Sequence, residues 1–140
     1  MIHRRPFFCS FAGDGDPSGM IPARSEIPRE YTWDLEVVFP SAETWEESFR
    51  LLGEEMERLG GYNGRLFESP GTLLEFLKLE EGASERMGRL YAYAVMKSHE
   101  DTADAARQAR AERAGTLLAS YGAVLSFYRP EVLAAGAEGV

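Results

Sequence analysis

Apolar residues recur every three or four positions over residues 45–59, which is the spacing of one face of an α-helix. This face consists of Trp45, Phe49, Leu52, Met56 and Leu59. Ser41 precedes it, and a serine there can accept a hydrogen bond from an unpaired N–H group of the first turn. The glycine pair that follows Leu59 is a common helix stop. The pattern predicts a first helix from just after Ser41 to Gly60.

A second helical pattern opens at Ser69 and Pro70, a pair that suits the cap and first turn of a helix. Its apolar positions are Leu73, Phe76, Leu77, Ala83, Met87, Leu90 and Ala94. Gly82 lies inside the pattern, where glycine is about 1 kcal/mol less favourable than alanine. We therefore expect the helix to bend or break at Gly82 and to end near Lys97 and Ser98.

A third helical pattern starts around Asp101 and Thr102, and its first half is rich in alanine, which permits close approach of a neighbouring helix. Its apolar face continues through Leu117, Tyr121, Val124 and Tyr128. We expect Pro130 to end this helix, although residues 130–135 are compatible with a further short helix. Because no strand pattern and no repeat occur, the fold class predicted is all-α, an antiparallel bundle of about three long helices.

The residues before the first helix follow no regular period. Residues 1–25 are predicted to form a flexible tail, because glycine and proline interrupt any regular element at Gly13, Gly15, Pro17, Gly19 and Pro22. Met20 is either the natural start after an over-long reading frame or part of a genuine tail. Residues 26–40 are aromatic and close with Pro40, so we expect an extended arm that lies over the helical core.

Composition excludes several classes of function. A length of 140 residues with 44% hydrophobic content suits one domain with its own core. The net charge of −8 argues against nucleic acid and anionic membranes as partners. No apolar run reaches the roughly 20 residues that cross a bilayer. Cys9, the single cysteine, cannot form an internal disulfide, and the N-terminus lacks a full signal-peptide pattern, so we predict a cytoplasmic protein.

Arginine far outnumbers lysine, and the chain has one asparagine and one glutamine. Few thermolabile amides are typical of thermophile proteins, and a GC-rich genome produces the same bias.

No catalytic, cofactor-binding or metal-binding residue is predicted. His99 and Glu100 resemble the start of the zinc motif HExxH, but the fifth position is Ala103 where the motif needs histidine. We interpret residues 99–103 as a turn between helices. Tyr91 and Tyr93 are two positions apart and face different sides of the second helix, so one can pack in the core while the other reaches a surface or cleft. Core packing is the expected role, and the alternative is a tyrosine offered to a peptide ligand.

Several short runs, in their order and spacing over residues 23–133, make the chain resemble the N-terminal part of oligoendopeptidase F proteins, zinc peptidases of the thimet-oligopeptidase superfamily. These runs are residues 24–28, 31–35, 39–41, 64–66, 73–74, 88–94, 97–102, 125–127 and 130–133. The resemblance implies a long all-helical peptidase that cleaves short peptides in an enclosed channel. It also implies a zinc ion held by two histidines of HExxH and a further glutamate, which lie later in the family's chain and have no matching position here.

On this resemblance, residues 26–133 are a helical N-terminal segment that forms one wall of the channel and is inactive alone. Residues 134–140 depart from the family's pattern, which predicts a truncation by a frameshift, a fragmentary gene or deliberate shortening. The expected partners are the missing catalytic domain and, in the full-length protein, short peptides. Exposed apolar faces favour self-association. The alternative is a free-standing helical module for protein interaction.

Overall fold

The computed structural model describes residue 22 and residues 24–137. The chain divides into two units, Met1–Thr32 and Trp33–Val140. In the first unit, the described residues form two 3-10 turns, η1 (Arg24–Glu26) and η2 (Arg29–Tyr31). The predicted tail, with its possible start at Met20, lies almost entirely outside the described residues, as does Cys9.

The second unit confirms the predicted all-α fold. Its elements are η3 (Leu35–Val37), α1 (Ala42–Gly60), α2 (Pro70–Glu100), α3 (Ala105–Val124), η4 (Leu125–Phe127) and α4 (Tyr128–Ala137). No strand occurs between residues 24 and 137.

The local geometry predicted for the arm was wrong, because short 3-10 turns replace an extended segment. Turn η3 closes with a hydrogen bond from the Val38 N–H to the Leu35 carbonyl at 3.0 Å. The turn brings Leu35 and Phe39, four positions apart, onto the helices, and both side chains are buried. From residue 33 onward, the arm is therefore attached to the bundle through the buried side chains of Leu35 and Phe39.

Helix α1 begins and packs as predicted. The Ser41 hydroxyl accepts a hydrogen bond from the Thr44 N–H, and the Thr44 hydroxyl accepts one from the Ser41 N–H, which forms a capping box. The predicted apolar face is buried at four of its five positions, and only Phe49 is partly accessible. Ser48 lies on the same face and is also buried.

Helix α2 is longer than predicted. Ser69 caps it by accepting a hydrogen bond from the Thr72 N–H at 3.0 Å, and Pro70 occupies its first turn. The helix runs unbroken through Gly82, so a break there, one of the two outcomes expected, was wrong. It ends at Glu100, beyond the predicted end near Lys97 and Ser98. Tertiary packing supplies the reason, because α2 contacts α1 and α3, and such packing outweighs a propensity cost of about 1 kcal/mol.

Helix α3 begins later and ends earlier than predicted. The Asp104 carboxylate caps it by accepting hydrogen bonds from the N–H groups of Ala106 and Arg107. The helix ends at Val124 and passes through η4 into α4. The prediction that Pro130 ends α3 was wrong, because Pro130 lies in the first turn of α4. A proline is tolerated there, since a first-turn N–H group has no partner within the helix. The further short helix is present, and it starts at Tyr128.

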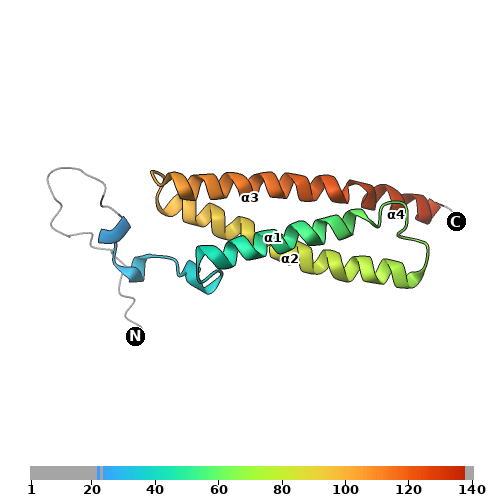
Figure 1. Cartoon of the computed structure of the whole chain (residues 1–140), viewed down its shortest axis with the longest axis horizontal. Coiled ribbons are helices and arrows are strands. Elements are labelled where there is room, and N and C mark those ends of the chain that lie inside the picture. The colour runs from blue at the N-terminus through green and yellow to red at the C-terminus, as the bar shows by residue number, and fades with distance from the viewer. Residues whose placement is uncertain (1–21, 23, 138–140) are drawn as a thin grey trace, which may run out of the picture. The chain divides into compact units, whose positions relative to one another are not determined.

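Side-chain contacts set the relative directions of the three long helices. They pair Trp45 with Leu90, Glu55 with Arg86, Gln108 with Ser98, Tyr121 with Glu80, and Glu46 with Arg113. Early positions of α1 meet late positions of α2, and early positions of α3 meet late positions of α2. Helix α2 therefore runs back along both α1 and α3, which share one direction (Figure 1).

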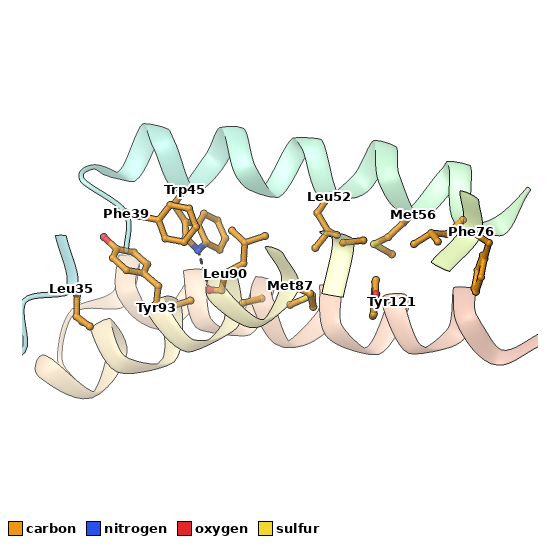
Figure 2. Packing of buried hydrophobic residues seen from close by; sticks show 14 of the residues in the cluster. Leu35, Phe39, Trp45, Leu52, Met56, Phe76, Met87, Leu90, Tyr93 and Tyr121 are labelled. Atoms are coloured by element: carbon orange, nitrogen blue, oxygen red, sulfur yellow. Dashed lines mark hydrogen bonds between the residues drawn. The ribbon is translucent and has the colours of Figure 1, made fainter. Parts of the chain in front are cut away.

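The core lies mainly between α1 and α2 (Figure 2). Its fully buried large side chains are Trp45, Leu52, Leu59, Leu66, Phe76 and Leu90. Helix α3 contributes Ala114 and Tyr121 as its buried residues. The alanines predicted to bring α3 close to a neighbour are mostly exposed, and only Ala114 is buried.

Candidate functional site

Residues from two of the resembling runs meet where the arm contacts α2. The Phe39 ring packs edge-on against the Tyr93 ring, with centroids 5.2 Å apart. The Arg89 guanidinium lies over the Phe39 ring, 5.6 Å from its centroid, and donates a hydrogen bond to the Val38 carbonyl. These contacts fix the arm to the bundle, so the two runs have a structural role at this point.

Trp45 joins α1 to both other long helices. Its indole N–H donates to the Leu90 carbonyl at 3.1 Å, as Figure 2 shows, and its side chain is fully buried. The guanidinium groups of Arg110 and Arg113 lie 5.6 and 5.3 Å from its ring. Such cation–π contacts add to apolar burial.

Arg113 also forms a two-pronged ion pair with Glu46, at 2.7 and 2.8 Å. Hydrogen bonding to this guanidinium lowers the pKa of the Glu46 carboxyl. The pair links α1 to α3 at the surface.

His99 and Glu100 are the last two residues of α2, so the prediction that they form a turn was wrong. The turn between helices covers residues 101–104 instead. The Glu100 side chain is 8% exposed and accepts hydrogen bonds from Lys97 and Arg107, at 3.3 and 3.1 Å. It ties the end of α2 to the start of α3, whereas His99 is exposed.

Tyr91 and Tyr93 separate as predicted. Tyr93 is buried in the core, and Tyr91 is partly exposed on the surface of α2. A partly exposed tyrosine combines an apolar ring with a polar hydroxyl, which suits contact with another polypeptide.

Two of the surface grooves of the second unit lie beside α1. The first has a volume of about 480 Å³ and lies between the arm, α1 and α2, with Phe39, Leu51, Gly82, Arg86 and Arg89 among its lining residues. The second, of about 420 Å³, lies between α1 and α3 and is lined by small or apolar residues with Glu112 and Arg113. Both grooves offer mixed apolar and charged walls for a packed chain segment.

Three charged groups of the first groove, Glu47, Arg86 and Arg89, have partners. Arg86 forms two hydrogen bonds with the Glu55 carboxylate, at 3.0 and 3.2 Å, and Glu47 is paired with Arg50. Among residues 24–137, no group of three or more histidine, cysteine or acidic side chains is arranged to hold a metal ion. Within the same residues, no helix is long and apolar enough to cross a membrane.

Among the buried titratable groups with a shifted pKa, Tyr121 shows the largest shift. Burial raises its pKa to about 12, helped by the Glu80 carboxylate, which accepts a hydrogen bond from its hydroxyl at 3.2 Å. A tyrosine held in its neutral form by burial serves packing between α2 and α3.

Apart from Tyr91, sequence reasoning did not identify which large apolar side chains are exposed on the second unit. They are Trp33, Val37, Phe67, Leu74, Leu77, Tyr91, Leu118, Val132 and Leu133. Leu77 was predicted in the core face of the second helix but is 39% exposed. Trp33 is 74% exposed, and exposed aromatic and aliphatic side chains of this kind are enriched at contacts with other polypeptides. Their periodicity alone does not separate a core position from a contact position.

The chain is similar to several bacterial oligopeptidases. Oligopeptidase PepF of Bacillus subtilis is 37% identical over 116 residues, which cover 83% of this chain and 17% of that protein. Group B oligopeptidase PepB of Streptococcus agalactiae is 37% identical over 110 residues, 79% of this chain and 18% of that protein. The chromosomal oligoendopeptidase F of Lactococcus lactis subsp. cremoris is 34% identical over 115 residues, 81% of this chain and 19% of that protein.

The matched stretch is thus less than a fifth of the length of these relatives. No family model matches the chain. No solved structure matches it either. The identities over about four fifths of the chain confirm its resemblance to an N-terminal segment of the oligoendopeptidase F proteins.

Proposed function

We propose that this chain serves as a helical wall segment of an oligoendopeptidase F-like zinc peptidase and supplies no catalytic group itself. The observation that carries the proposal is the similarity to named oligopeptidases over about 80% of the chain. The positions of the resembling runs support it. Phe39, Leu90 and Tyr93 fix the arm and the α1–α2 interface, and Glu100 ties α2 to α3.

On this proposal, zinc and the cleavage of short peptides belong to the rest of the peptidase. The chain alone is inactive, and its partner is the catalytic part of the same protein. The exposed apolar side chains and the two grooves are surfaces that this partner covers.

The direct test is a chimera of Bacillus subtilis PepF in which this chain replaces the stretch of 116 residues that it matches. We expect the chimera to bind zinc and cleave short peptides. A matched chimera with Trp45→Ala should lose activity through loss of the α1–α2 interface, whereas Tyr91→Ser should keep the fold. A well-folded chimera with zinc but without cleavage would contradict the proposal.

The isolated chain gives a second test. We expect no stoichiometric zinc by metal analysis and no cleavage of a fluorogenic peptide. Cleavage that a chelator abolishes and zinc restores would overturn the proposed lack of a catalytic group.

A free-standing helical interaction module is the second candidate, because the exposed Trp33 and Tyr91 fit contact with a separate protein as well as contact with the catalytic part. The two candidates differ in the behaviour of the purified chain. A stable monomer that binds a separate protein through these residues supports the module. Self-association that the catalytic part of PepF suppresses supports the peptidase segment.

We also propose that the protein is cytoplasmic and comes from a thermophile, on its single cysteine and its few amide residues. A thermal midpoint well above the roughly 45–65 °C of mesophile domains would agree with the second point. A midpoint within that range would contradict it.

A further inference from the structure

A carboxylate from α4 is bound by the backbone of the loop that joins α1 to α2. Glu131 accepts hydrogen bonds from the N–H groups of Gly64 and Leu66, the latter at 3.4 Å. These groups are more than 60 positions apart in the sequence. Gly64 has a φ of 77°, a conformation that favours glycine and that lets neighbouring N–H groups form a concave site for an anion.

Helix α4 otherwise has little that holds it. The α-helical path of α3 ends at Val124, and the 3-10 turn η4 separates the two helices. Tyr128, the first residue of α4, packs against Phe76 with ring centroids 5.1 Å apart. After Tyr128, no described side chain of α4 is buried, and Leu133 is 65% exposed. The contact of Glu131 is thus the main attachment beyond the first turn.

We propose that α4 is a latched segment that opens as a unit about η4 while α1, α2 and α3 stay folded. The Glu131 carboxylate on the Gly64 and Leu66 amides is the latch. A segment with few buried contacts and one polar attachment is expected to open locally at lower free energy than the core. Opening leaves the loop amides open to another anionic group. This inference does not depend on the proposed function.

Amide hydrogen exchange of the whole chain, followed by NMR, tests the latch. Glu131→Ala removes the charge-assisted hydrogen bonds of the carboxylate. Amide exchange at Gly64, Leu66 and residues 132–136 should therefore be about tenfold faster in this variant than in the wild type. The amides of Phe76 and Leu90 in α2 should keep their protection. Glu68→Ala is the matched control, because Glu68 lies in the same loop and pairs with the Arg65 side chain.

Glu131→Gln keeps one carbonyl acceptor and removes the charge, so its exchange rates should fall between those of the wild type and the alanine variant. If Glu131→Ala also loses amide protection in α2, the rates of residues 132–136 are compared between the wild type and Glu131→Gln instead. Equal rates for residues 132–136 in the wild type and in Glu131→Gln and Glu131→Ala would overturn the latch. So would wild-type exchange of these residues in step with α2.

Discussion

The α1–α2 interface and the face of α3 differ in how they are built. Large side chains fill the first, among them Trp45, Leu52 and Leu90, all with no exposed surface. Helix α3 is of similar length to α1 but buries only Ala114 and Tyr121. Against α1 it places one surface ion pair, Glu46–Arg113, and the Arg113 guanidinium over the Trp45 and Phe49 rings. Large buried side chains hold α1 to α2, whereas partly exposed contacts hold α1 to α3.

The difference indicates where the apolar burial of the bundle is concentrated. Burial of a large apolar side chain contributes about 1.5–3 kcal/mol, so most of the apolar stabilisation comes from side chains of α1 and α2. The exposed alanine side chains along α3 are small and cost little in water. The predictions below separate these two parts, beginning with the largest expected effect.

The two tryptophans give the strongest test of the α1–α2 interface. Trp45→Ala should lower the free energy of unfolding by about 3–5 kcal/mol, because it removes a buried ring and its hydrogen bond to Leu90. Trp33→Ala should change it by less than about 0.5 kcal/mol, because Trp33 is exposed. Urea denaturation followed by circular dichroism measures both. Similar losses for the two variants would contradict the contrast.

Two ion pairs compare the interfaces directly. Double-mutant cycles should give the half-buried Glu55–Arg86 pair, between α1 and α2, a coupling of about 1–2 kcal/mol. The more exposed Glu46–Arg113 pair, between α1 and α3, should give at most about 0.5 kcal/mol. The reverse order would show that α3 depends on charge more than its geometry indicates.

Tyr121 tests the contact of α3 with α2. Tyr121→Phe should cost about 1 kcal/mol at neutral pH through loss of the hydroxyl bond to Glu80. The pKa of Tyr121 is raised to about 12 in the folded state, above the value of about 10 in an unfolded chain. Its contribution to stability is therefore complete below pH 10 and is lost as the pH rises toward 12. Urea titrations from pH 9 to the highest pH that the fold tolerates should show a steeper decline for the wild type than for the phenylalanine variant.

The smallest effect concerns helical glycines that no neighbour requires. A Cβ atom added at Gly115 of α3 or at Gly82 of α2 meets nothing within 4 Å. Each change to alanine should therefore stabilise the fold by about 0.5–1 kcal/mol. Gly64→Ala is the opposite control, since its positive φ makes a side chain unfavourable. Thermal unfolding of the three variants measures the signs.

The helices that could be predicted from sequence are those whose local signals agree with their packing. Ser41 as a cap and the face from Trp45 to Leu59 point to the same helix, and α1 follows both. The predictions made at Gly82 and Pro130 were wrong because they considered only the local propensity of each residue. Packing on two sides carries α2 through Gly82, and the position of Pro130 in a first turn makes it harmless.

The contacts that join distant parts of the chain were beyond prediction from one sequence. Arg113 reaches Glu46, and Glu131 reaches Gly64, each across 67 positions. Nothing in the spacing of these residues encodes the pairing, because it depends on how the finished helices lie. For the same reason, Leu77 reads as a core residue in the pattern and is partly exposed in the fold.

Because Trp45 is buried and Trp33 is exposed, the two tryptophans can serve as intrinsic fluorescence probes of the chain. Indole emission shifts to shorter wavelength in an apolar setting and is quenched by aqueous iodide where the ring is accessible. Trp45 should therefore emit at short wavelength, resist iodide and report the integrity of the bundle. Trp33 should emit at long wavelength and quench readily. A partner that covers the arm would protect Trp33 alone, so one spectrum distinguishes binding from unfolding without any added label.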